Sequence, residues 1–123
     1  MNFLPYQIEV LNRAREMLGK QFQMNMAVEE MSELTKELCK DMRGKGDINS
    51  ITDEVADVYI MLKAMELAYN LDGTRIAEIV LGKIDRLSNR LDVREQSGIK
   101  PGENSIELDK RADAAFALQQ KAR

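Results

Sequence analysis

Two pairs of acidic residues share one spacing in this sequence: Glu30 with Glu33, and Glu54 with Asp57. Residues three apart on a helix lie on the same side, about one turn from each other. In the segment 51–70, the second pair interrupts a side that is otherwise apolar and should be buried in a helical bundle. Carboxylates gathered in a partly apolar groove repel one another and lose hydration, and a divalent cation would relieve both costs. The two pairs therefore predict a metal site.

The kind of metal follows from the ligand chemistry. The chain contains no histidine and one cysteine, so the candidate ligands are carboxylate oxygens, which suit Mg²⁺, with Mn²⁺ as a substitute, far better than Zn²⁺. Ferritin-like di-iron sites use Glu-x-x-His motifs, so the lack of histidine argues against that class. Acids at this spacing are also common on solvated helix faces. We assign Glu29 and Glu37 to that interpretation or to a supporting position behind the ligands.

Helices must position these acids, and the composition favours helices. Leu, Met, Ala, Glu, Lys and Arg dominate, whereas there are two prolines, three tyrosines and three phenylalanines. Glycine, aspartate and asparagine, which favour turns, interrupt the apolar patterns at 43–50 and 71–73. Helices are therefore predicted from Pro5 to Gly19, from Gln21 to Met42, from a cap at Ser50 or Thr52 to about residue 70, from a cap at Thr74 to before Gly98, and from a cap at Ser105 through Ala122.

These segments predict an all-α fold, an antiparallel helical bundle of four main helices. The helices on either side of 43–50 should form an antiparallel hairpin that brings the two acidic pairs face to face. One bundle domain is predicted over residues 1–96, followed by a linker and a C-terminal helical segment over 97–123. That segment has few large apolar residues, so we expect it to pack on a partner subunit. The bundle itself should assemble into a larger one by oligomerisation, because a hairpin pair of this length exposes much apolar surface.

The charge balance limits the partners. A net charge of −3 and a pI near 5.1 give no general attraction to nucleic acid or to an anionic membrane. The first residues lack a basic region ahead of an apolar stretch, and the longest uninterrupted apolar run, VYIML, is far too short to cross a bilayer. A single cysteine allows no internal disulfide, which suits a reducing compartment. We expect a cytoplasmic protein that binds neither nucleic acid nor membrane.

The paired acidic motif resembles the MazG-type all-α nucleoside triphosphate pyrophosphohydrolases, whose pattern is EExxE followed by ExxD. Here it reads Glu29-Glu30-Met31-Ser32-Glu33 and Glu54-Val55-Ala56-Asp57, with twenty residues between the two. The similarity covers about residues 20–95 and is strongest in VEEMSEL and DEVADVYIML. Gln23, seven residues before Glu30, stands where members of this family often carry a glutamine.

The resemblance implies Mg²⁺-dependent cleavage of a (deoxy)nucleoside triphosphate between the α and β phosphates, giving the monophosphate and pyrophosphate. It implies that Glu30, Glu33, Glu54 and Asp57 are the catalytic metal ligands, with Gln23 and Glu29 behind them or at the substrate. Members of the family are helical bundles that form dimers or tetramers, with sites built at the subunit interfaces.

Cations for the phosphates are available in the segment GKIDRLSNRLDVR. Lys83, Arg86 and Arg90 fall on one side of the predicted helix and could bind the triphosphate tail. The alternative interpretation is a solvated basic face. The family often places a Lys, an Asn and an Arg here at a fixed spacing, and this sequence departs from it, because Asn89 projects about 100° away from Lys83 and Arg90. The rival function is a non-catalytic helical oligomer that binds nucleotides or protein partners.

Overall fold

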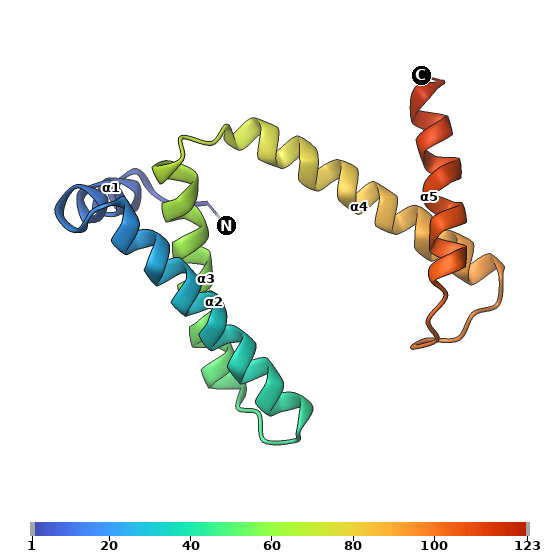
Figure 1. The fold of residues 1–123 in the computed structure, drawn as a ribbon, viewed down its shortest axis with the longest axis horizontal. Helices are drawn as coiled ribbons and strands as arrows, with labels where there is room; N and C mark the ends of the chain where they lie inside the picture. The colour runs from blue at the N-terminus through green and yellow to red at the C-terminus, as the bar shows by residue number, and fades with distance from the viewer. Residues whose placement is uncertain (1, 123) are drawn as a thin grey trace. The chain divides into compact units, whose positions relative to one another are not determined.

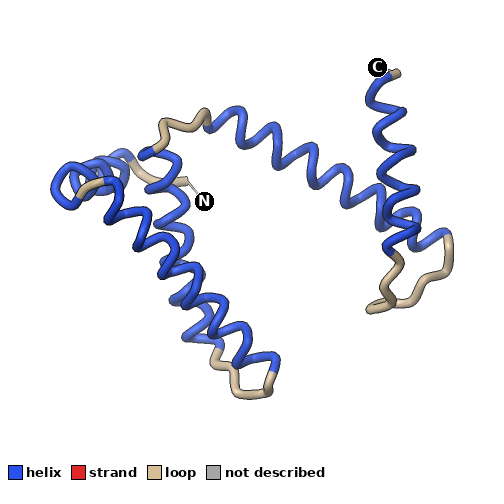
Figure 2. The backbone as a smooth tube through the Cα atoms, in the orientation of Figure 1, coloured by secondary structure: helices blue, strands red, loops and turns tan. Residues whose placement is uncertain are grey.

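Within residues 2–122, which the computed structural model describes, the chain forms five helices and no strand (Figures 1 and 2). They are α1 (Pro5–Leu18), α2 (Lys20–Met42), α3 (Ile48–Ala68), α4 (Gly73–Gln96) and α5 (Ile106–Lys121). The predicted all-α class is confirmed. By their internal contacts the helices fall into two units, divided between Asp72 and Gly73, so α4 belongs with α5. The predicted division at residue 96 and the contact of 97–123 with a partner subunit remain predictions.

The third helix begins earlier than predicted. Asp47 is its N-cap, and the Asp47 carboxylate accepts hydrogen bonds from the Asn49 amide (3.0 Å) and the Ser50 hydroxyl (3.1 Å). Both predicted caps are therefore wrong, because Ser50 and Thr52 lie within α3. The Thr52 hydroxyl instead donates to the Ile48 carbonyl (2.7 Å). A carboxylate has two acceptor oxygens, so Asp47 can satisfy an amide and a hydroxyl at once.

Of the caps predicted for α4 and α5, the first is wrong and the second is confirmed. The predicted cap at Thr74 is wrong, because α4 begins at Gly73 and Thr74 lies in its first turn. Ser105 is the N-cap of α5 as predicted, and its hydroxyl accepts a hydrogen bond from the Leu108 amide (3.4 Å). The turn between α2 and α3 depends on Gly46, where a Cβ would lie 2.7 Å from the Asp41 Cα.

In the first unit, α2 and α3 form the predicted antiparallel pair, and α1 packs on both (Figure 1). The core is small: Ala27, Met61 and Ala64 are buried, and a few half-buried apolar side chains, Leu11, Met26 and Met65, pack against them. Two of the three buried residues are alanines, so the α2 and α3 backbones can approach closely at this level. That approach allows acidic side chains on neighbouring turns to meet across the pair.

In the second unit, polar contacts join α5 to α4. Arg90 Nε donates to Asp113 (2.8 Å), and Arg94 Nε and Nη2 donate to the two oxygens of Asp109 (3.0 and 2.8 Å). The Asn89 amide donates to the Ala112 carbonyl (2.9 Å), and Ala112 is itself buried. Charged pairs and one small side chain thus fasten α5 to α4.

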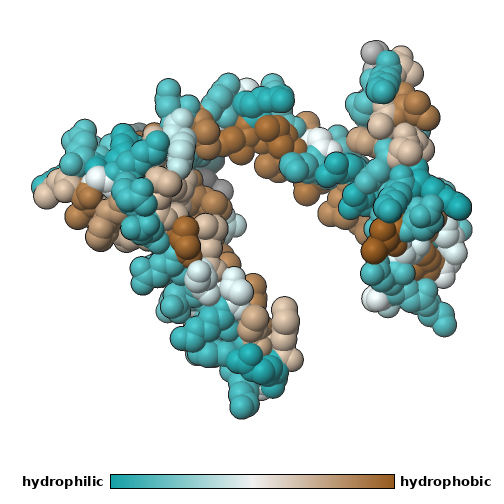
Figure 3. Space-filling view, viewed as in Figure 1, coloured by the Kyte–Doolittle hydropathy of each residue, from teal (hydrophilic) through white to brown (hydrophobic). Residues whose placement is uncertain are grey.

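Many apolar side chains stay exposed within each unit. On α4 they form a stripe of large aliphatic residues, and Figure 3 shows apolar side chains gathered over the first turns of that helix. The stripe consists of Ile76, Ile79, Val80, Ile84, Leu87 and Leu91. Among the described residues, no helix has both the length and the apolar character needed to cross a membrane.

Candidate metal centre

Three of the four predicted ligands meet between α2 and α3. Glu30 comes from α2, and Glu54 and Asp57 come from successive turns of α3. One carboxylate oxygen from each of the three lies within 4.8 Å of the other two, and all three residues are half-buried. This cluster begins one turn away from the buried Ala27 and Met61. The hairpin therefore places three carboxylates just beyond the core, and we call them the acidic cluster.

Glu33 lies beside the acidic cluster rather than in it. It is half-buried one turn beyond Glu30 on α2, and its charge contributes to the raised pKa of Glu54. In an antiparallel pair, moving forward along α2 means moving backward along α3, so Glu30 faces Asp57 most closely and Glu33 faces Glu54. The structure places Glu33 near the three oxygens without bringing its own oxygen into the set.

The electrostatics of the cluster match its geometry. Burial raises the pKa of Glu30 above 4.5, and the charges of Asp57, Glu54 and Glu29 raise it further, as does a hydrogen bond with Asp57. Burial likewise raises the pKa of Glu54, followed by the charges of Asp57 and Glu33. Two carboxyl groups can share a hydrogen bond only when one of them is protonated. Without a cation the cluster therefore retains protons more strongly than isolated carboxyl groups would.

One oxygen of the cluster lacks a partner. Glu54 Oε2 is buried, and no described group forms a hydrogen bond with it. A buried carboxylate oxygen without a donor or a cation is costly, which is why such atoms are rare in folded proteins. The cluster thus combines an unsatisfied oxygen with the hard, all-oxygen ligand set that Mg²⁺ and Mn²⁺ prefer.

The two predicted supporting residues have different surroundings. Gln23 is buried, at 2% exposure, and its Nε2 donates to the Leu11 carbonyl of α1 (3.2 Å), while its Oε1 has no partner among the described residues. Glu29 is exposed and acts on the cluster through its charge, which raises the pKa of Glu30. Gln23 therefore joins α2 to α1, and Glu29 influences the acidic cluster through its charge alone.

The predicted phosphate-binding cations belong to α4, in the second unit. Lys83 and Arg86 are exposed, whereas Arg90 is half-buried and paired with Asp113. That pairing lowers the pKa of the Asp113 carboxyl through the hydrogen bond with Arg90, and the charge of Arg86 contributes. Lys83 and Arg86 form no ion pair with any residue in the described part of the chain. Phosphate binding by the three cations remains a prediction.

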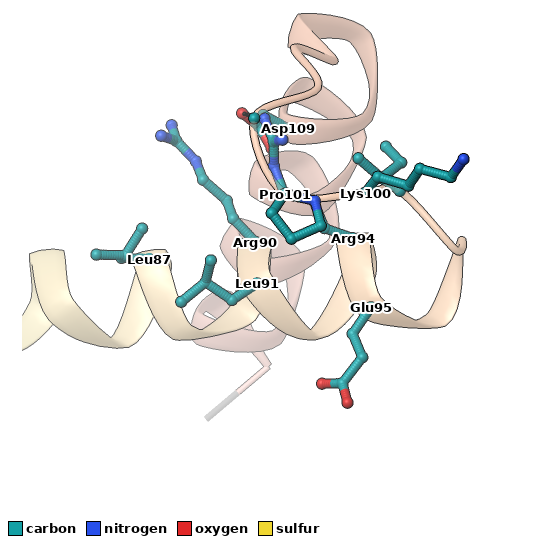
Figure 4. Close-up of a pocket in the computed structure, with 10 residues that line it drawn as sticks. Leu87, Arg90, Leu91, Arg94, Glu95, Lys100, Pro101 and Asp109 are labelled. Atoms are coloured by element: carbon teal, nitrogen blue, oxygen red, sulfur yellow. Dashed lines mark hydrogen bonds and ion pairs between the residues drawn. The ribbon is translucent and has the colours of Figure 1, made fainter.

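Sequence reasoning missed the pairs that Arg94 and Arg90 form. Figure 4 shows Arg94 reaching from α4 towards Asp109 of α5. The signal was present: two arginines four apart on one helix and two aspartates four apart on the next, 90 and 94 with 109 and 113. Matched spacing of opposite charges on consecutive helices predicts such a contact.

Comparisons of the chain with protein-family models, with curated proteins and with solved structures gave no match. The likeness to MazG-type enzymes therefore rests on the acidic motif and its surroundings in the sequence.

Proposed function

We propose that this chain is a Mg²⁺-dependent nucleoside triphosphate pyrophosphohydrolase of the MazG type, cleaving a (deoxy)nucleoside triphosphate into the monophosphate and pyrophosphate. The observation that carries the proposal is the acidic cluster, with oxygens of Glu30, Glu54 and Asp57 within 4.8 Å of one another. The unpartnered Glu54 Oε2 supports a cation at that point.

Each residue has a role in this proposal. Glu30, Glu54 and Asp57 would hold the ion, and Glu33, one turn along α2, would complete the ligand set. When bound, Mg²⁺ supplies charge neutralisation at phosphate oxygens and lowers the pKa of a bound water. Ionised carboxylates are required for binding, so the protons that the cluster retains must leave as the ion enters. One of the four carboxylates, or the neighbouring Glu29, would orient the attacking water.

The phosphate tail needs positive charge as well as metal. The candidates are Lys83, Arg86 and Arg90. Because Arg90 is paired with Asp113, the two exposed cations Lys83 and Arg86 are the ones available to a phosphate. Arginine can form two parallel hydrogen bonds to a phosphate, whereas lysine acts as a point charge.

The test is a product assay with Mg²⁺ and a panel of nucleoside triphosphates, in which chromatography separates monophosphate plus pyrophosphate from diphosphate plus phosphate. We expect pyrophosphate release, reduced at least about 100-fold in Glu54→Gln, because loss of one ligand weakens metal binding and charge stabilisation together. Glu16→Gln, which removes an exposed acid on α1, is the matched control and should keep full activity. Release of orthophosphate, or turnover unaffected by Glu54→Gln, would contradict the proposal.

A second candidate function, a non-catalytic helical oligomer, is favoured by the exposed apolar side chains of α3. Val55, Tyr59 and Leu62 keep 36%, 42% and 56% of their surface exposed. They line a groove of about 230 Å³ together with Leu34 and Val58. Assembly into a dimer or tetramer would cover this groove, and it is compatible with either function.

A further inference from the structure

One face of α4 is apolar and turned away from α5. The contacts with α5 come from Asn89, Arg90 and Arg94, which are half-buried. A set of large aliphatic side chains lies roughly a third of the helix circumference away from them. Its members stay exposed, and we call them the heptad face: Val80 (52%), Ile84 (55%), Leu87 (47%) and Leu91 (55%).

The spacing of the heptad face is typical of a helix that pairs with another helix. Its members follow one another at intervals of four, three and four residues. This alternation keeps one apolar side of a helix towards its partner in a coiled coil. Every residue of α4 between 73 and 88 is exposed. The heptad face therefore has the pattern of a pairing surface that its own unit leaves uncovered.

Charges border the heptad face differently on its two sides. The tripeptides KID at 83–85 and RLD at 90–92 lie seven residues apart. Each tripeptide therefore has its cation on one side of the apolar residue and its aspartate on the other. Lys83, Asp85 and Asp92 form no ion pair within the described part of the chain. One edge of the heptad face is thus basic and the other acidic, with charges available to a partner.

These edges distinguish the two ways in which two copies of α4 could pair by a two-fold axis. In a parallel pair, the basic edge of each copy lies beside the acidic edge of the other, on both sides of the interface. In an antiparallel pair, each edge lies beside its own kind, so that basic residues face basic residues. Like charges across an interface disfavour that arrangement. Charge complementarity therefore selects the parallel pair.

We propose that α4 pairs with α4 of a second copy of this chain, as a parallel two-stranded coiled coil formed by the heptad face. Each of the four apolar residues then meets its own counterpart, and Lys83 of one copy lies on the side where the other carries Asp85 and Asp92. The pairing does not rest on the proposed hydrolysis, because the acidic cluster belongs to the unit that ends at Asp72. It also uses a different surface from the apolar groove of α3.

Disulfide trapping tests the orientation as well as the contact. In a Cys39→Ser background, which removes the exposed native cysteine, Val80→Cys or Leu91→Cys places one thiol near either end of the heptad face. A parallel pair brings each thiol next to its counterpart at both ends, whereas an antiparallel pair does so only near the middle. With oxidised glutathione and the full chain at micromolar concentration, both variants should form covalent dimers on a non-reducing gel.

Arg75→Cys in the same background is the matched control. Arg75 is exposed, at 68%, and lies on the opposite side of α4 from the heptad face. We expect Val80→Cys and Leu91→Cys each to give at least about 10-fold more covalent dimer than Arg75→Cys, because pairing raises the effective concentration of the two thiols far above micromolar. Trapping at one end only, or trapping no greater than in Arg75→Cys, would overturn the proposal.

Two additions to the cysteine variants identify the surface. Ile84→Glu places a charge in the heptad face and should remove the excess of covalent dimer. Because the Ile84 side chain is exposed, the helix content measured by circular dichroism should stay that of the parent. Leu62→Glu changes the groove of α3 and should leave the trapping unchanged. Trapping that survives Ile84→Glu, or that is lost in Leu62→Glu, would mean that another surface brings the thiols together and would overturn the proposal.

Discussion

At the scale of single residues, the acidic cluster has an electrostatic cost, because burial and like charges disfavour the ionised forms of Glu30 and Glu54. Glu30 and Glu54 are half-buried next to Asp57. Burial raises the pKa of both groups, and the charges of neighbouring carboxylates raise it further. A fold that only needed to pack α2 against α3 could have used leucine or methionine at these positions, as it does at Met61. The cost is explained if a cation or a proton occupies the cluster under working conditions.

This cost predicts a pH dependence of stability in the absence of metal. The pKa of Glu30 and of Glu54 lies above 4.5 in the folded chain. Above that value the folded state holds more protons than the unfolded state, so the free energy of unfolding falls as the pH rises through the folded pKa values. We expect the melting temperature in EDTA, followed by circular dichroism, to be higher near pH 5 than near pH 7 because of these two groups.

A double variant, Glu30→Gln with Glu54→Gln, isolates this contribution. It should flatten the slope of melting temperature against pH in that interval. The arginine-paired Asp109 and Asp113 do not interfere, because their pKa values lie below 3.8 and their stabilisation is lost only at lower pH. Added Mg²⁺ should raise the melting temperature of the parent more near pH 7 than near pH 5. A slope that the double variant leaves unchanged would contradict this account.

At the scale of helices, α5 is joined to α4 by two arginine–aspartate pairs. Ala112 is its one buried residue among those described, and polar contacts with α4 come from the pairs Arg90–Asp113 and Arg94–Asp109 and from the Asn89 hydrogen bond to the Ala112 carbonyl. In the second pair each side chain keeps less than a quarter of its surface exposed, at 24% and 23%. Pairs that are partly shielded and use two hydrogen bonds stabilise more than exposed ones.

Breaking one pair should loosen α5. We expect Asp109→Ala to lower the protection of α5 amides against hydrogen exchange about 5-fold. Hydrogen exchange followed by mass spectrometry on the full chain is the measurement, because it reports on α5 separately from the first unit.

The Arg75–Glu78 pair provides the matched control. It lies on the exposed face of α4, with 68% and 62% of the two side chains accessible. Removing it with Arg75→Ala should leave the protection of α5 unchanged, since exposed ion pairs contribute little. Equal effects of the two substitutions would mean that the pair with Asp109 does not fasten α5.

The sequence predicted the hairpin and its acids because both depend on local rules. Two acids three apart must share a helix side, and the glycine-rich turn at 43–47 allows only an antiparallel return. The sequence did not show that Glu33 lies outside the acidic cluster. The position of Glu33 depends on the rotation of α2 about its axis, which Ala27 and Gln23 fix through tertiary packing. The cap of α3 was misassigned because Asp47 and Ser50 are both good capping residues and only the backbone shows which one the helix uses.

At the scale of the whole molecule, large exposed apolar side chains are more numerous than buried apolar ones among the described residues. Ala27, Met61, Ala64 and Ala112 are the buried apolar residues among those described, whereas many larger aliphatic and aromatic side chains lie exposed on the two units. Exposed apolar patches of this kind mark interaction surfaces.

Self-association is therefore expected. In sedimentation velocity the chain should have about twice or four times the monomer mass of 14.0 kDa. Leu62→Glu places a charge in the apolar groove of α3, so it should shift the distribution towards the monomer. Thr35→Glu adds the same charge at an exposed polar position of α2 and should leave the mass unchanged. A parent that sediments as a monomer at micromolar concentration would exclude this assembly.

The two arginine–aspartate pairs also fix the register between α4 and α5. The earlier arginine, Arg90, meets the later aspartate, Asp113, and Arg94 meets Asp109. If α5 slipped by one turn along α4, one pair could re-form, but an arginine and an aspartate would be left over without each other. An apolar seam of similar aliphatic side chains would tolerate the same slip at little cost. The two pairs therefore make one alignment of α4 and α5 more stable than the alignments shifted by one turn. Apolar contacts alone would select the alignment less sharply.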